Sequence, residues 1–178
     1  GIQLRGLPKR YTTVYIDGVK MSDPSSVDNS YYVSSIMKDS IERVEILKGS
    51  QSTLYGSSAI GGTINIFTKK GSKGKHQDYD ISTGSNGTTN LSASLNGADD
   101  YHNFYLGLNS FSTDGISAMN DSPNTNDDDS YTNQGMVSNY GYKINENISF
   151  RGGVRYNDSL LNYDEVKAGR TDANNKTD

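Results

Sequence analysis

The stretch GSQSTLYGSSAIGG, residues 49–62, has the glycine and serine content of loops that bind phosphate. A phosphate-binding loop of the GxxxxGK[ST] type needs a lysine that reaches the phosphates and a hydroxyl that binds magnesium. Here Gly56 leads into two serines and an alanine, so the lysine is missing. The dinucleotide pattern GxGxxG is missing too, because Gly61 and Gly62 are adjacent and precede an apolar run. The stretch therefore predicts a compact turn packed closely against another surface, and no nucleotide site.

Side chains that serve as nucleophile and base do not form any catalytic motif in this sequence. The chain has no cysteine, which excludes a thiolate metal site and a cysteine nucleophile. The serines near Gly56 lack the G-x-S-x-G spacing of a nucleophile elbow. His76 and His102 stand at the start of strand-like runs without a partner pattern. We expect a chain that is not an enzyme.

A run of carboxylates, NTNDDDS at residues 124–130, has a composition that suits a hard cation. Ca²⁺ takes about 6–8 oxygen ligands, and carboxylates on neighbouring hairpin loops supply oxygens of this kind. Bound calcium would also order an acidic loop that otherwise repels itself. The other reading is a solvated acidic loop, since runs of charge usually face water. The residues alone leave both readings open.

Length and composition limit what these motifs can belong to. The 178 residues are enough for a domain with a sizeable core. The 17 basic and 21 acidic residues give a net charge of -4, which argues against a nucleic-acid partner. No run approaches the ~20 apolar residues of a membrane helix, which excludes helical membrane spans. Membrane β-strands alternate apolar and polar residues, so the same observation does not exclude them. The chain starts without methionine and ends in a polar loop-like segment, so we expect a fragment.

The first part of the chain mixes short strands with turns. Strand-like runs occur at residues 12–19, 41–49 and 61–71, and the pair Asp17 and Gly18 is a strong hairpin signal. This part predicts a small α+β unit over residues 1–71.

The pattern changes after Gly71 to long alternating strands. One face of each strand is apolar and the other polar or small, and about five such strands are predicted. Each is close to or above the ~9–11 residues of a tilted membrane strand. The apolar positions are Leu91, Ala93, Leu95, Phe104, Leu106, Leu108, Met136, Tyr140, Tyr142, Ile144, Ile148, Phe150, Val154 and Tyr156.

Two architectures produce this alternation: a soluble sheet with one wet face and a membrane barrel with lipid outside. Two features favour the barrel. Connections at residues 97–101 and 145–147 are tight, whereas residues 115–130 are long and polar, as in outer-membrane barrels. Tyrosines also gather near strand ends, as in an interfacial aromatic belt. They are Tyr79, Tyr101, Tyr131, Tyr142 and Tyr163. Five strands are too few to close a useful barrel, so we expect more beyond residue 178.

Four segments occur in a fixed order: IQLRG at 2–6, VYIDGV at 14–19, IERVEILKG at 41–49 and STLYGSSAIGGTINIFTKKG at 52–71. Together they resemble the plug domain of TonB-dependent outer-membrane receptors. The resemblance implies an α+β plug domain, with residues 1–71 as its C-terminal part. Antiparallel transmembrane β-barrel strands follow at residues 72–178, an incomplete fragment of a roughly 22-stranded barrel. The family's TonB box and the first part of the plug would precede Gly1.

The second part is similar to the vitamin B12, or cobalamin, branch of that family. The similar segments are STDGISAMN, NTNDDDSYTN and RYNDSLLNYDEV. The resemblance implies calcium in extracellular loops, and no other cofactor. Thr125 stands where the family has a glutamine, and the order of glycine and aspartate around the first ligand also differs. The implied metal ligands are Asp114, Asp127, Asp129, Tyr163 and Asp164.

In this family the ligand rests on the outward apices of the plug and on inner barrel loops. The turn after LRG is one apex, and residues 23–31 form a second. Cationic side chains there would meet anionic groups of a ligand, and tyrosines would stack on it. A solvated basic turn is the alternative. The implied substrate-binding residues are Pro8, Lys9, Arg10, Tyr11 and Tyr31.

The resemblance implies TonB-dependent, energy-coupled uptake of a scarce ligand, cobalamin, across the outer membrane of a Gram-negative bacterium. The implied partners are TonB with its inner-membrane energising complex, a small-molecule ligand such as cobalamin or a ferric chelate, and outer-membrane lipid. Nucleic acid is not among them. A ferric-siderophore receptor is the alternative within the family. A passive porin or a surface adhesin is the alternative outside it, and a porin does not need the plug-like residues 1–71.

Overall fold

The structure, a computed structural model, describes residues 2–24, 26–33, 36–49, 59–116, 129–167 and 170–177; within the last two ranges, side chains are described as far as Asn162. The chain divides into two compact units, Gly1–Lys69 and Lys70–Asp178. In the described residues, no helix has the length and apolar character needed to cross a membrane.

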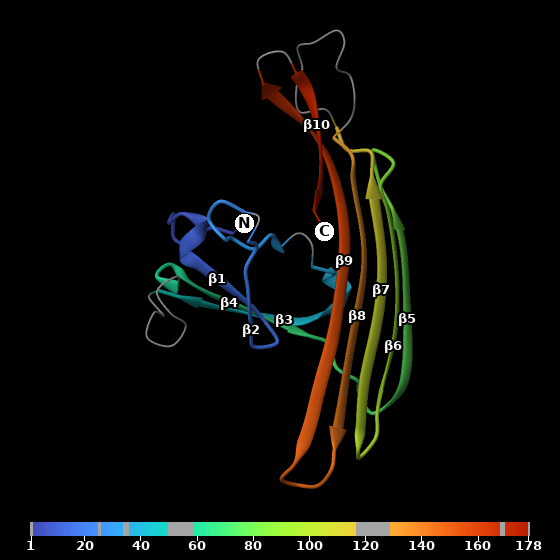
Figure 1. The fold of residues 1–178 in the computed structure, drawn as a ribbon. Coiled ribbons are helices and arrows are strands. Elements are labelled where there is room, and N and C mark those ends of the chain that lie inside the picture. Colours follow the sequence, from blue (N-terminus) through green and yellow to red (C-terminus); the bar gives the residue numbers. More distant parts are fainter. Residues whose placement is uncertain are drawn as a thin grey trace. The chain divides into compact units, whose positions relative to one another are not determined.

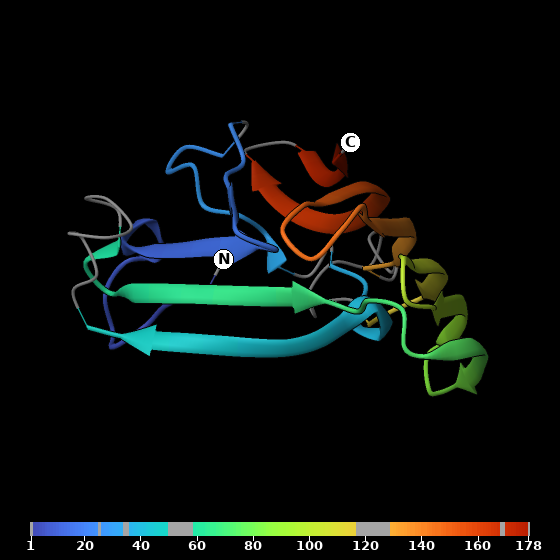
Figure 2. The ribbon, with the colours of Figure 1, turned by 90° about the horizontal axis from the view of Figure 1, so that it is seen from below.

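The first unit is built on a four-stranded sheet in the order β2-β1-β4-β3. Its strands are β1 (Thr12–Ile16), β2 (Val19–Met21), β3 (Ile41–Lys48) and β4 (Gly62–Thr68). β1 pairs antiparallel with β2 and parallel with β4, which pairs antiparallel with β3. Figure 2 shows β3 in cyan and β4 in green beside the blue β1. Two 3-10 turns, η1 (Lys9–Tyr11) and η3 (Lys38–Ser40), lead directly into β1 and β3.

The turn between β1 and β2 is the hairpin that the sequence predicts. Asp17 and Gly18 have φ values of 50° and 85°, the left-handed conformation of a type I′ turn. The Asp17 carboxylate also accepts hydrogen bonds from the Thr68 backbone N–H at 2.8 Å and from the Thr68 hydroxyl at 2.6 Å. One aspartate therefore shapes the hairpin and ties it to the end of β4.

The core of this unit lies on one face of the two central strands. Val14 and Ile16 of β1 and Ile64 and Ile66 of β4 form a buried cluster. Partly buried apolar side chains pack against it from the loops and edge strands: Leu4, Met21, Tyr31, Val33, Ile36 and Ile41. The sheet thus has a small, well-defined core, and the segments before β1 and after β2 cover it.

The second unit is a six-stranded antiparallel sheet in which consecutive strands are neighbours (Figure 1). Its strands are β5 (Gly74–Thr83), β6 (Thr89–Ala98), β7 (His102–Thr113), β8 (Tyr131–Lys143), β9 (Ser149–Lys167) and β10 (Arg170–Thr177). The sequence pattern predicts about five strands; β10 adds one among the described residues. Its sequence RTDANNKT has no apolar alternation to mark it.

The strand register places the predicted apolar positions on one face. Leu91 lies opposite Ser110, Ala93 opposite Leu108 and Leu95 opposite Leu106. Successive side chains of a strand point to opposite faces, so these positions share a face with the apolar residues of β8 and β9. Tyr79 and Ile81 of β5 lie on the same face, opposite Ala93 and Leu91. Many apolar side chains of this face are exposed, among them Tyr79, Ile81, Leu108, Phe150, Val154 and Tyr156. The other face is mainly polar, with Val137 and Tyr105 as buried exceptions.

Short turns join β6 to β7 and β8 to β9. The Asp99 carboxylate accepts backbone hydrogen bonds from His102 at 2.7 Å and Tyr101 at 2.8 Å. These bonds, that of His102 first, lower the pKa of Asp99. The Asn145 side chain accepts equivalent bonds from Asn147 and Ile148, both at 2.9 Å. Asp and Asn favour such turns because their side chains bond the backbone two or three residues on.

The segment before β5 is fixed by asparagine side chains of the same unit. The Gly71 N–H donates to Asn103 Oδ1 at 3.1 Å, and the Asn103 amide donates back to the Gly71 carbonyl at 2.7 Å. Ser72 donates to Asn96 Oδ1 through its backbone at 3.3 Å and its hydroxyl at 3.1 Å. We call these four residues the asparagine clamp. A Cβ on Gly71 would collide with the Gly97 carbonyl, so only glycine fits there.

Candidate functional site

The turn that leads into β1 carries the predicted ligand-binding residues. Pro8 precedes η1, and the Tyr11 N–H donates to the Pro8 carbonyl at 2.9 Å. The Tyr11 carbonyl accepts from the Gly61 N–H at 2.9 Å, which ties the turn to the start of β4. Lys9, Arg10 and Tyr11 therefore lie on a short turn that continues into β1 and is tied at Tyr11 to the residue before β4.

Arg10 is exposed and lies beside Tyr11. Its guanidinium carbon is 4.8 Å from the centre of the Tyr11 ring, and Nη2 donates to the Tyr11 hydroxyl at 3.3 Å. This contact keeps the arginine extended over an aromatic face while its charge stays in water. The pair therefore presents the guanidinium group of Arg10 and the aromatic ring of Tyr11 side by side.

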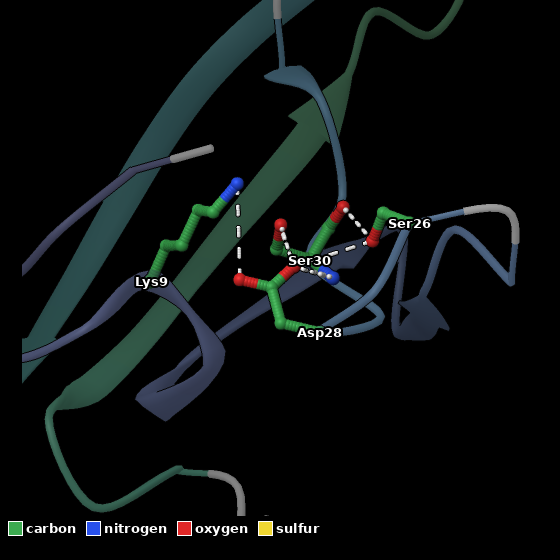
Figure 3. Close-up of polar contacts among 4 residues, drawn as sticks. All are labelled: Lys9, Ser26, Asp28 and Ser30. Carbon is green, nitrogen blue, oxygen red and sulfur yellow. Dashed lines mark hydrogen bonds and ion pairs between the residues drawn. The ribbon is translucent and has the colours of Figure 1, made fainter.

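Lys9 faces Asp28, as Figure 3 shows. Its Nζ is 3.7 Å from Asp28 Oδ2, and it lies 5.6 Å from the centre of the Tyr32 ring. The lysine and aspartate side chains are 38% and 22% exposed. The structure thus joins the two predicted apices of the first unit through one ion pair.

Asp28 is held in place by serines on both sides. Its Oδ1 accepts from the Ser30 hydroxyl at 2.7 Å, the Ser30 N–H at 3.3 Å and the Ser26 hydroxyl at 3.3 Å. The Ser30 hydroxyl bond is the largest cause of a lowered pKa of Asp28, and the nearby Lys9 charge lowers it further. Because Oδ1 takes all three bonds, Oδ2 is left facing Lys9.

Tyr31 and Tyr32 differ in environment. Tyr31, the predicted ligand contact, is half-buried and packs against the core cluster. Tyr32 is 45% exposed and is the ring beside Lys9. Asp28 was not among the predicted site residues, although it lies within the predicted second apex. The alternation Ser26, Asp28, Ser30 is a signal for an ordered Asx-type turn, and that signal points to Asp28.

We expect the Lys9–Asp28 pair to stay charged in mildly acidic solution. The pKa of Asp28 is lower in the folded protein than in the unfolded chain, so its contribution is present above the unfolded value. That contribution disappears only as the pH falls through the lowered, folded value. Titration of the Asp28 carboxyl in the full-length protein, followed by its NMR chemical shift, should show the group mainly charged from pH 7 down to about pH 4, the ordinary Asp value. A titration midpoint near pH 6 would contradict this prediction.

Two predicted metal ligands, Asp114 and Asp129, are described in full, and both lie toward one end of the second sheet. Asp114 follows β7, and its N–H donates to the Asn86 carbonyl of the β5–β6 turn at 2.9 Å. Asp129 precedes β8, and its carbonyl lies so close to Gly115 that a Cβ there would collide with it. Thr113 pairs with Tyr131 across the two strands.

The remaining predicted metal ligands are only partly described. Asp127 lies outside the described residues. The backbones of Tyr163 and Asp164 lie in β9, opposite Ala173 and Asp172 of β10, and their side chains are outside the description. Two carboxylates fall short of the 6–8 oxygens that Ca²⁺ takes. In the described parts of the chain, no three His, Cys, Asp or Glu side chains gather closely enough to hold a metal ion.

Comparisons with known proteins identify the first unit. Residues 1–63 match the family model of the TonB-dependent receptor plug domain. The chain is 31% identical over 167 residues to the vitamin B12 transporter BtuB of Photobacterium profundum, a match covering 92% of this chain and 27% of that protein. The chain belongs to the TonB-dependent receptors. It spans about a quarter of the length of that curated relative.

Siderophore receptors are also similar to this TonB-dependent receptor chain. It is 37% identical over 87 residues to the ferrienterobactin receptor of Escherichia coli strain K12, covering 44% of this chain and 12% of that protein. The match to the vitamin B12 transporter extends through the second unit, whereas this one covers less than half of the chain.

Solved structures confirm the fold as a plug domain followed by antiparallel barrel strands. The ferric enterobactin receptor PfeA of Pseudomonas aeruginosa superposes with a TM-score of 0.68 at 18% identity, over 90% of this chain and 26% of that one. The pyoverdine receptor FpvA of Pseudomonas aeruginosa PAO1 gives 0.71 at 19% identity, over 89% of this chain and 22% of that one.

Proposed function

We propose that the receptor containing this chain takes up cobalamin across the outer membrane, with energy supplied through TonB. The observation that carries the ligand assignment is the extent of the similarity to a vitamin B12 transporter, which covers 92% of this chain and therefore includes barrel strands and loops. The plug family itself does not distinguish cobalamin from other ligands. The second unit is where receptors of one family diverge, because loops carry recognition.

Ligand contact is assigned to the surface at residues 8–11 with its neighbours Asp28 and Tyr32. Arg10 and Tyr11 offer a cation and a ring for polar groups and for the flat face of a ligand. A bound ligand would favour the plug conformation whose N-terminal box is exposed to TonB, because a ligand shifts an equilibrium toward the state it binds better. TonB and its inner-membrane energising complex would then move the plug.

The apolar face of the second sheet is assigned to outer-membrane lipid. Exposed Ile81, Phe150 and Val154 lie on this face, together with Tyr79 within β5 and Tyr156 within β9. This exposure of apolar and aromatic side chains agrees with a lipid-facing wall. The same assignment places the receptor in the outer membrane of a Gram-negative bacterium.

Calcium is assigned to the loops at the end of the second sheet that holds Asp114 and Asp129. Asp127, Tyr163 and Asp164 would complete the ligand set. The ion would supply charge that orders mutually repelling carboxylates over the ligand entrance. The residues themselves would provide hard oxygen ligands and hold the loops together.

Equilibrium binding to the full-length receptor tests the ligand and the metal together. We expect cyanocobalamin to bind more tightly than ferric enterobactin, and more tightly with calcium than with a chelator. Replacing both Asp127 and Asp129 by asparagine should remove the calcium effect, with affinity falling to the chelator value. Tighter binding of ferric enterobactin would overturn the cobalamin assignment. Equal affinity with calcium and chelator would overturn the metal assignment alone.

A ferric-siderophore receptor is the second candidate. It is favoured by the similarity of 87 residues to the ferrienterobactin receptor and by the exposed cation Arg10. This candidate predicts binding of a ferric chelate that is indifferent to calcium. A porin or an adhesin has no use for a plug domain, and a closed pore in liposomes would separate the receptor from a porin.

A further inference from the structure

We propose that Asp28 is a specificity-determining residue: by compensating Lys9, it tunes the ligand-contact surface to ligands of low net charge and against multiply anionic ferric chelates. The ligand-contact surface is defined here as residues 8–11 together with Asp28 and Tyr32. This inference rests on the proposed function, because it assumes that ligand meets this surface.

The first observation is the orientation of the Asp28 carboxylate. Three donors from Ser26 and Ser30 converge on Oδ1 at 2.7–3.3 Å, and Oδ2 lies 3.7 Å from Lys9 Nζ (Figure 3). A carboxylate on a free surface loop would be able to turn away from the lysine. Here the serines fix its direction, so the negative charge stays beside Lys9.

The second observation is the balance of charge on the surface. Lys9 and Arg10 carry positive charge, and Asp28 offsets that of Lys9. Arg10 contacts Tyr11, a neutral partner, so its charge remains uncompensated by that contact. The surface therefore presents one effective cation with two aromatic rings, Tyr11 and Tyr32.

This balance favours one class of ligand over another. A ferric tris-catecholate is multiply anionic, and a fixed carboxylate near its binding surface repels it. A ligand of low net charge that carries amide groups and a flat ring system meets little repulsion and gains contact with the rings. Specificity against a competitor commonly uses such a repulsive element beside the attractive ones.

The ion pair is too exposed to serve chiefly as a stabilising contact. Pairs of this exposure contribute little to stability, because water screens them and long side chains lose freedom. An ordinary solvated pair would affect the two ligand classes equally. A specificity role predicts that the anionic ligand gains affinity when the charge is removed and that the ligand of low net charge does not.

The experiment compares equilibrium binding of cyanocobalamin and ferric enterobactin to the full-length receptor and its variants. Asp28→Asn retains an oxygen that the serines can bond and removes only the charge. We expect affinity for ferric enterobactin to rise about tenfold, with affinity for cyanocobalamin unchanged or lower. The double variant Lys9→Gln with Asp28→Asn should bring the ferric enterobactin affinity back to the wild-type value.

Glu146→Gln is the matched control. Glu146 pairs with Lys143 at 3.0 Å beside the β8–β9 turn, so the variant removes the same charge from another exposed pair. It should leave both affinities unchanged. Equal changes for both ligands in Asp28→Asn, or the same rise in Glu146→Gln, would overturn the proposal. The proposed function is tested separately, by which ligand the wild-type receptor binds more tightly. The effect of Asp28→Asn on ferric enterobactin affinity can be measured whatever that preference is.

Discussion

Replacing Ile16 by alanine is expected to destabilise the plug sheet by about 2–5 kcal/mol. Ile16 is fully buried at the end of β1 and belongs to the cluster with Val14, Ile64 and Ile66. Two neighbours in that cluster, Ile64 and Ile66, lie on the other central strand, β4, which cannot move inward without breaking its pairs with β1 and β3. The cavity left by the lost side chain would therefore persist.

Hydrogen exchange of the β1 and β4 amides in the full-length receptor measures this loss locally. Val19→Ala is the matched control, because Val19 lies on the neighbouring β2 and is 64% exposed. Its exchange rates should stay close to wild type, and Ile16→Val should fall between the two at about 0.5–1.5 kcal/mol. If Ile16→Ala exchanged no faster than Val19→Ala, the core assignment would be wrong.

Gly71→Ala is expected to cost about 3 kcal/mol or more, the upper range for overpacking. The new Cβ would collide with the Gly97 carbonyl and lie 2.6 Å from the Phe104 carbonyl oxygen. Both obstacles are backbone atoms of paired strands, so no side-chain rotation relieves them. The asparagine clamp would have to open, and the start of β5 would move with it.

The folded fraction of the full-length receptor after refolding into detergent, followed by heat-modifiable gel mobility, measures this effect. Gly152→Ala is the control in β9, because its nearest neighbour is a Phe150 ring atom at an ordinary 3.6 Å. The control should fold as wild type does. Equal yields from the two variants would show that the chain before β5 tolerates a side chain.

Much of the fold could be predicted because both strand types leave a pattern in the sequence. Alternation from Leu91 to Tyr156 predicts the apolar face of the second sheet, and the observed register places these residues together. β10 gave no signal, since RTDANNKT is polar at every position of either face apart from one alanine. Backbone pairing with β9 forms that strand without the help of an apolar pattern.

The candidate site was harder to predict than the fold. Residues 8–11 were predicted from a family resemblance, and their ligand contact stays a prediction. The neighbouring tyrosines Tyr31 and Tyr32 are equivalent in sequence, and only the packing of Val33 and Tyr31 onto the core shows which ring points outward. Asp28 lies 19 positions from Lys9, so their pairing depends on the path of a loop that no local pattern specifies.

The asparagine clamp also has a consequence for strand assembly. Asn103 bonds both backbone groups of Gly71, as a neighbouring strand would, and only Ser72 and Lys73 separate that point from Gly74, which pairs with Ala98. A slip of β5 by one residue would turn Tyr79 and Ile81 from the apolar face to the polar one. The clamp therefore sets the register in which β5 pairs with β6. A shift of one residue at the clamp would exchange the two faces of the whole strand.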